Sequence, residues 1–194
     1  MKSREVDVGD SEIVRWSLDD PNAFAELFHR YAGEIGRYVT RRLGAGIADD
    51  VVAETFLIAF RRRGAYDNAR GDARSWLYGI AHHLMQRHRR DEVRALRAYA
   101  RTGIDPVVAE SFDERVAGRL SAAATSRALA PALAGLDAGQ RDVLLLTAWA
   151  DLTIDQVAKA LGIPDGTARS RLNRARTKIR AALNVIESTT SEAK

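Results

Sequence analysis

Cysteine is absent from the 194-residue sequence, so neither a disulfide framework nor a thiolate metal site or nucleophile is possible. No apolar stretch approaches the roughly 18 residues that a membrane span requires. The first ten residues are charged and lack the apolar core of a secretory signal peptide. Strand-forming residues are scarce, whereas alanine, leucine and arginine are abundant, which favours helices. We therefore expect a cytoplasmic, all-α protein without membrane insertion.

The net charge of +4 is distributed unevenly along the chain. Residues 61–97 carry 10 basic and 4 acidic side chains, and residues 165–183 carry 6 basic and 1 acidic. Such basic clusters are the electrostatic footprint of binding to a phosphate backbone. For one cluster alone, a solvated helix face is an equally good interpretation. Two clusters, each at the end of a helix with apolar periodicity, favour nucleic-acid binding.

Apolar residues recur every three or four positions in the N-terminal half, which is typical of packed helices. Three long helices are expected there, over residues 20–43, 49–63 and 74–97. The first is expected to bury Phe24, Leu27, Phe28, Tyr31, Ile35 and Tyr38. The third is expected to bury the apolar face that contains Trp76. Its opposite face is expected to expose Ser75, His82, Gln86, Arg89 and Arg90. The loop before it, residues 65–73, is rich in Asp, Asn and Gly and is predicted to be ordered.

The segment from Leu152 to Leu183 predicts a helix-turn-helix. Thr153 and Gln156 form a capping box, and Gly162 suits the left-handed turn between the two helices. The second helix has an inner stripe of Ala168, Leu172, Ala175, Ile179 and Leu183. Its outer face carries Arg169, Ser170, Asn173, Arg174 and Thr177. Guanidinium, amide and hydroxyl groups in this arrangement read base edges in a major groove. The alternative is a solvated basic helix within a bundle.

Three segments resemble extracytoplasmic-function sigma factors. DDVVAETFLIAF (residues 49–60) is similar to region 2.2, SWLYGIAHHLMQRHRR (residues 75–90) to regions 2.3 and 2.4, and LTIDQVAKALGIPDGTARSRLNRARTKIRAAL (residues 152–183) to region 4. The resemblance implies two small helical domains, a region 2 bundle and a region 4 helix-turn-helix, joined by a flexible linker. The predicted boundaries are 10–97 for region 2, 98–120 for the linker, 121–186 for region 4 and 187–194 for a tail. The separation of the domains is then expected to differ between the free, inhibited and polymerase-bound states.

The same resemblance implies a transcription initiation factor that is not an enzyme, and it assigns roles to particular residues. Region 2.2 would dock on the polymerase β′ clamp helices through Asp50, Glu54, Thr55 and Phe56. Periodicity favours Glu54 and Thr55 as exposed contacts. Phe56 lies in the inner stripe, so a place in the core explains it at least as well, and Asp50 is equally well explained as a helix cap. Candidates for binding the minus-ten element are Asn68, Arg70, His83, Arg87, Arg89 and Arg90. Candidates for binding the minus-thirty-five element are Thr167, Arg169, Ser170, Arg171, Asn173 and Arg174.

The implied partners are core RNA polymerase, through its β′ clamp helices and β flap, promoter DNA, and an anti-sigma factor that holds the protein until a signal arrives. Free of partners, the chain is expected to be monomeric. It would associate with the nucleoid when active and could be tethered at the membrane through the anti-sigma factor. His83 stands where many relatives have Asn, and Asn173 where larger side chains are common, so the promoter sequence cannot be copied from relatives.

Two other classes of function fit parts of the sequence. A repressor or activator that binds operators alone needs only the C-terminal block and leaves the first basic cluster unexplained. A hydrolase built on His82, His83 and His88 lacks a phosphate-binding glycine loop, a nucleophile elbow and an HExxH pattern. The spacing of these histidines is also poor for one helical face. We therefore expect no cofactor and no metal.

Overall fold

The computed structural model describes residues 8–67, 72–102 and 129–192, and for residues 185–192 the backbone alone. In chain order its helices are α1 (Asp10–Asp19), α2 (Ala25–Leu43), α3 (Ala45–Arg62), α4 (Ala73–Met85), α5 (Arg89–Thr102), α7 (Ala138–Trp149), α8 (Ile154–Leu161) and α9 (Asp165–Glu192). Short 3-10 turns lie at Pro21–Phe24, Arg63–Ala65 and Gln86–His88, and residues 129–135 are also helical. No strand occurs in these described ranges, so the all-α prediction is confirmed.

Capping residues explain where the first helices begin and end. The Asp20 carboxylate accepts a hydrogen bond of 3.0 Å from the Asn22 backbone N–H, with Pro21 in the first turn. Gly44 ends α2 with a φ of +89°, which favours glycine. This single residue makes the whole turn, so α3 begins at Ala45 and not at the expected Asp49.

The later helix boundaries differ from the sequence-based expectation at three places. The expected helix over residues 74–97 is two helices, because a 3-10 turn separates α4 from α5. Helix α5 then continues to Thr102, into the predicted linker, with Tyr99 buried against the protein. Helix α9 continues to Glu192, through most of the predicted tail.

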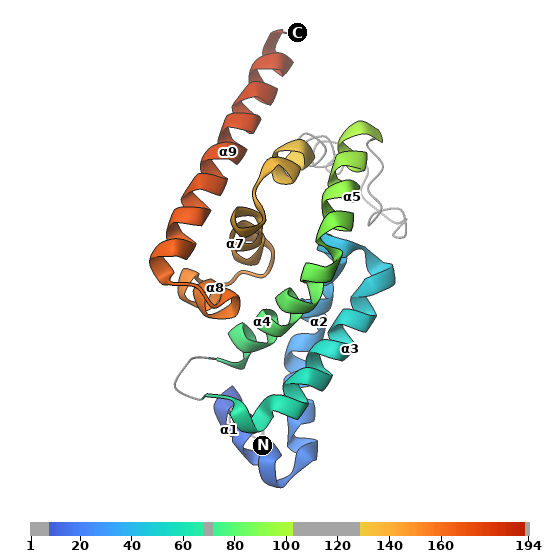
Figure 1. Cartoon of the computed structure of the whole chain (residues 1–194), viewed down its shortest axis with the longest axis vertical. Helices are drawn as coiled ribbons and strands as arrows, with labels where there is room; N and C mark the ends of the chain where they lie inside the picture. The colour runs from blue at the N-terminus through green and yellow to red at the C-terminus, as the bar shows by residue number, and fades with distance from the viewer. Residues whose placement is uncertain (1–7, 68–71, 103–128, 193–194) are drawn as a thin grey trace, which may run out of the picture.

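The helices α2, α3 and α4 pack together as the N-terminal bundle (Figure 1). Tyr38 and Tyr78 meet edge to face at its centre, with ring centroids 5.4 Å apart. Phe28, expected in the buried stripe, is 45% exposed and contacts Phe56 only at its edge. Other almost fully buried side chains of this bundle include Leu27, Ile35, Val39, Ala59, Leu77 and Ala81.

The C-terminal half consists of residues 129–135, α7, α8 and α9, and it packs directly on the N-terminal bundle. Figure 1 shows α8 beside α4, with α9 projecting along the long axis of the molecule. Val143, Leu146 and Val157 are fully buried and belong to the same continuous apolar cluster as the bundle core. The two halves are therefore closed on one another.

Candidate nucleic-acid interface

The helix-turn-helix forms as the sequence predicts. The Gln156 backbone N–H donates to the Thr153 hydroxyl at 3.3 Å, and the Thr153 N–H donates to the Gln156 side chain at 2.9 Å. These reciprocal bonds complete the capping box at the start of α8. Gly162 then takes the left-handed conformation, with φ +63° and ψ +36°. The Ile163 N–H closes the turn on the Ala158 carbonyl oxygen at 3.0 Å.

Helix α9 separates an inner stripe from an outer face. Ala168, Leu172 and Ala175 are buried, and Ile179 is partly buried, so the expected packing side is correct. The outer face exposes the predicted DNA-contacting residues Arg169, Ser170, Asn173 and Arg174, with Thr167 half-buried at its start. Two hydroxyls on this face bond to their own helix, Ser170 to the Thr167 carbonyl and Thr177 to the Asn173 carbonyl. The side chains of Arg169, Asn173 and Arg174 on the same face are exposed to solvent.

Arg171 differs from the other candidates in α9 because its guanidinium turns back toward α7. A Cβ built on Gly139 would lie 2.9 Å from the Arg171 Cζ atom, so the guanidinium packs on the bare glycine backbone. Lys178 also reaches α7, where its Nζ donates to the Gln140 side chain at 3.0 Å. Arg171 and Lys178 therefore both contact α7 and help to hold α9 against it.

The basic edge of the N-terminal half lies at the junction of α4 and α5. His83, Arg87 and Arg90 are exposed, and Arg89 is half-buried. Arg87 forms an exposed ion pair of 3.0 Å with Glu54 of α3, a type of pair that contributes little to stability. The other two minus-ten candidates, Asn68 and Arg70, lie outside the described residues.

Trp76, at the start of α4, packs against the Tyr66 ring at a centroid distance of 5.0 Å. Its side chain is partly buried against the apolar cluster, which agrees with the core role favoured by periodicity. It is therefore held in place next to the predicted minus-ten loop.

The predicted polymerase-docking residues of α3 differ in their exposure to solvent. Asp50 and Glu54 are exposed, whereas Phe56 is buried in the core. Thr55 is also fully buried, and its hydroxyl donates to the Val51 carbonyl at 2.6 Å, so its expected exposure is wrong. The sequence reading missed Leu57, which is 47% exposed on the same side as Glu54. Its neighbours at positions 50, 53 and 54 are all exposed, and this spacing could have revealed it.

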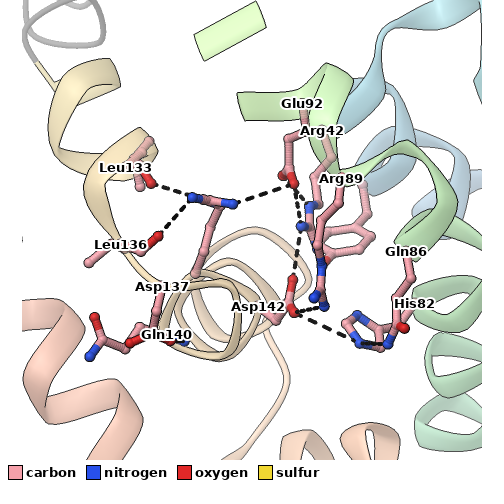
Figure 2. A network of polar contacts seen from close by, with 12 residues as sticks. Arg42, His82, Gln86, Arg89, Glu92, Leu133, Leu136, Asp137, Gln140 and Asp142 are labelled. Atoms are coloured by element: carbon pink, nitrogen blue, oxygen red, sulfur yellow. Dashed lines mark hydrogen bonds and ion pairs between the residues drawn. The ribbon is translucent and has the colours of Figure 1, made fainter. Parts of the chain in front are cut away.

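A buried ionic network joins the two halves (Figure 2). Arg42 of α2 donates to both carboxylate oxygens of Glu92 at 2.7 and 2.9 Å and to Asp142 of α7 at 2.9 Å. Asp142 also accepts from Arg89 at 3.1 Å and lies 3.8 Å from the His82 Nε2 atom. Arg42, Glu92 and Asp142 are each less than 8% exposed. Charges this deeply buried require full pairing, and among the described residues Asp142 finds its ion-pair partners in the other half.

The electrostatic consequences follow from burial and pairing. Burial alone would lower the pKa of Arg42, but Tyr38, Glu92 and Asp142 outweigh it and hold the pKa above its usual value. Burial raises the pKa of Tyr38 to about 12. Burial lowers the pKa of His82, because the opposing attraction of Asp142 is weaker. His82 is therefore neutral at pH 7.

Ser75 and His82 were expected on the exposed face of α4, and this is wrong. Both are buried, at 3% and 8% exposure, because the C-terminal half covers this face. Periodicity distinguishes the sides of a helix but not which side a second domain covers. The sequence alone also gave no reason to pair Asp142 with Arg42, 100 residues away.

Helix α4 and helix α8 approach each other closely. A Cβ added to Gly79 would lie 2.8 Å from the Ala160 carbonyl oxygen, so only glycine fits there. At the start of α4, Asp72 accepts a hydrogen bond from the Gln156 side chain. Burial acts to raise the pKa of Asp72, but the bonds from Ser75 and Gln156 outweigh it and lower the pKa.

Among the residues that the structure describes, no group of three or more His, Asp or Glu side chains could hold a metal ion. In the same residues, no helix combines the length and the apolar character needed to cross a membrane. His82 is buried toward Asp142, whereas His83 is exposed, so these neighbouring histidines face different surroundings.

These features define a two-part helical protein with a helix-turn-helix of the DNA-reading type. The sequence matches Sigma-70 region 2 over residues 27–95 and Sigma-70 region 4 over residues 126–179. It is 33% identical over 150 residues to the ECF RNA polymerase sigma factor SigC of Mycobacterium tuberculosis, with 76% of each chain covered. It is 31% identical over 158 residues to SigL of the same species, with 81% of this chain and 86% of SigL covered. The chain therefore belongs to the extracytoplasmic-function sigma factor family.

Solved structures agree with this assignment. CnrH in complex with the cytosolic domain of CnrY is similar with a TM-score of 0.64 and 25% identity, covering 91% of this chain and 97% of the other. The sigma factor RpoE of Bartonella quintana, in complex with the anti-sigma factor NepR, has the same fold with a TM-score of 0.57 and 20% identity over 84% of this chain and 97% of that one.

Proposed function

We propose that this sigma factor binds core RNA polymerase and directs it to promoters by reading two DNA elements, one with each half. The exposed outer face of α9, opposite a buried stripe within a capped helix-turn-helix, carries the proposal. Arg169, Asn173 and Arg174 would contact base edges and phosphates of the minus-thirty-five element. The chemistry of transcription belongs to the polymerase, so no residue of this chain is assigned a catalytic role.

The N-terminal half would bind the minus-ten element and the polymerase. His83, Arg87 and Arg90 form an exposed basic edge at the junction of α4 and α5 and would contact that DNA, together with Asn68 and Arg70 of the loop before α4. Asp50, Glu54 and Leu57 share the outer face of α3 and would dock on the β′ clamp helices. The β flap would hold the C-terminal half. The proposed boundaries remain 10–97 for region 2 and 121–186 for region 4.

We further propose that the halves separate on promoter DNA. The two elements lie about 25 base pairs apart, which corresponds to roughly 85 Å of duplex. In the closed form, α8 of the helix-turn-helix packs directly against α4, so the two proposed DNA-binding surfaces lie on neighbouring helices. The closed arrangement therefore cannot reach both elements at once. Because the solved relatives CnrH and RpoE are bound to CnrY and NepR, an anti-sigma factor that favours a closed form is the proposed inhibitor of this chain as well.

Run-off transcription with core polymerase on genomic promoter fragments tests the proposed function. We expect stoichiometric binding to core and specific transcripts, and a drop of about 10- to 100-fold in promoter affinity for Arg174→Ala, as for loss of a base contact. The Arg37→Ala variant, an exposed arginine of α2 outside the proposed surfaces, is the control. An operator-binding repressor would bind DNA alone and form no complex with core polymerase, and that result would refute the proposal.

A further inference from the structure

The exposed side of α5 carries a regular row of arginines, here called the α5 stripe: Arg90, Arg94, Arg97 and Arg101. Their spacing of 4, 3 and 4 residues places them within an arc of about 60° over roughly 16 Å of helix. Arg97 and Arg101 lie beyond residue 95, where the match to sigma-70 region 2 ends. The stripe exists only because α5 continues to Thr102.

The opposite side of α5 is fixed to the protein, which turns the stripe outward. Glu92 is held by Arg42, and Tyr99 is buried, so both anchor the inner side of the helix. All four arginines of the stripe are exposed. The helix is therefore presented in a fixed orientation, with the stripe on its exposed side.

Three arginines of the stripe, Arg90, Arg94 and Arg97, meet little negative charge among the described residues. Asp91 pairs with Arg94 at 2.9 Å, but both side chains are more than 60% exposed, so this pair is weak. Arg90 and Arg97 have no ion-pair partner in the part of the chain that the structure describes. The stripe borders a hollow of about 630 Å³ whose other lining residues include Arg89 and Val93. A surface with this excess of positive charge attracts an anion.

The shape of the stripe indicates which kind of anion it binds. A small phosphate is held by two or three cations that converge on one point, whereas these arginines are spread over three helical turns. A duplex backbone presents one phosphate per 3.4 Å of axis on each strand, so 16 Å spans about five of them. An acidic peptide usually needs large apolar anchor points as well, and the described lining of this hollow offers only two small apolar side chains, Val93 and Ala138.

We propose that the α5 stripe binds the sugar-phosphate backbone of duplex DNA between the two promoter elements. This rests on the proposed function, because α5 starts at the basic edge assigned to the minus-ten element. From there the chain leads toward the half that reads the minus-thirty-five element. Arg97 and Arg101 would therefore hold phosphates upstream of the minus-ten contacts, without reading sequence.

Holoenzyme binding to a promoter fragment, measured by fluorescence anisotropy across 50–200 mM salt, tests this role. Because each lost phosphate contact removes about 0.9 from the slope of log K against log salt, Arg97→Gln/Arg101→Gln should reduce the slope by about 2. Affinity should fall about tenfold in the same measurement. Arg97→Lys/Arg101→Lys keeps the charge and should restore most of the slope. Arg15→Gln/Arg37→Gln removes two exposed arginines from α1 and α2 and should change neither quantity.

A second arm locates the contact on the DNA. Neutral methylphosphonate linkages placed just upstream of the minus-ten element should weaken wild-type holoenzyme but have little further effect on the Arg97→Gln/Arg101→Gln variant. Unchanged slope and affinity in this variant, with wild-type holoenzyme active, would overturn the α5 proposal alone. The same holds if the variant binds DNA normally but loses a protein partner. Failure of wild type to form a promoter complex with core would overturn the proposed function together with the stripe.

Discussion

At the scale of single residues, Asp142 has the most distinctive surroundings. Its carboxylate belongs to the C-terminal half, but Arg42, Arg89 and His82 of the N-terminal half surround it. A buried pair gains little net stability over an apolar replacement, yet breaking one by removing a single partner is strongly unfavourable. Asp142 therefore matters mostly for how specifically the halves fit together.

Asp142→Asn should shift the protein from the closed to an open arrangement. The change leaves Arg42 and Arg89 short of negative charge, and the loss corresponds to about 3 kcal/mol. Energy transfer between dyes placed on the two halves measures their separation, which should increase. Asp155→Asn is the matched control, because Asp155 forms only an exposed pair of 2.8 Å with Lys159 within α8. Equal separation in Asp142→Asn and wild type would show that the network does not hold the halves together.

At the scale of helices, the contact between α4 and α8 depends on the missing side chain of Gly79. Gly79→Ala should stabilise α4 by itself, because alanine is the better helix former by about 1 kcal/mol. Its Cβ, however, would press on the Ala160 carbonyl at 2.8 Å, and backbone cannot yield as a flexible side chain does. We expect an open protein with an intact N-terminal bundle, seen as increased dye separation without loss of helical circular dichroism.

Gly36→Ala provides the comparison for that experiment. Gly36 also lies inside a helix, but its added Cβ would meet the Val52 side chain at 3.8 Å, an ordinary contact. This variant should gain helix stability and remain closed. If both alanine variants stay closed, the close approach of α4 and α8 does not limit the packing of the halves.

The helices also show how far the sequence could predict this structure. The inner stripe of α9 and the capping box of α8 were predicted correctly, because both depend on neighbours within four residues. The surroundings of Ser75 and His82 were not, since their exposure is decided by the C-terminal half, whose described part begins only at residue 129. The burial of Thr55 was not predicted. Its hydroxyl donates a hydrogen bond to the backbone of its own helix, so this polar side chain can be buried at little cost.

At the scale of the whole molecule, we expect the buried His82 beside Asp142 to make closure depend on pH. Burial lowers the pKa of His82 in the closed form, with Arg42, Arg89 and the exposed His83 acting in the same direction and Asp142 against them. In an open form the side chain returns to a pKa of about 6.5. Its closing contribution is therefore complete above about pH 6.5 and is lost as the pH falls through the lower pKa of the closed form.

The expected result is a dye separation that increases as the pH falls below about 6.5. His82→Gln should lessen this dependence, whereas His83→Gln, at an exposed position, should retain it. The His82 Nδ1 atom is buried without a hydrogen-bond partner among the described residues, so protonation gains nothing there. A protein that instead closes more firmly at low pH would show that the attraction of Asp142 dominates.

The buried network between the halves also lowers the apparent affinity of every partner that binds only the open form. If closure is favoured by about 3 kcal/mol, only about one molecule in 150 is open at any moment. The apparent affinity for core polymerase then falls by the same factor, although no atom of the polymerase-docking face has changed. Closure of the halves competes with binding of the partner. Because both halves belong to one chain, diluting the protein does not weaken closure. Variants such as Asp142→Asn would therefore bind core more tightly than wild type while having fewer native contacts.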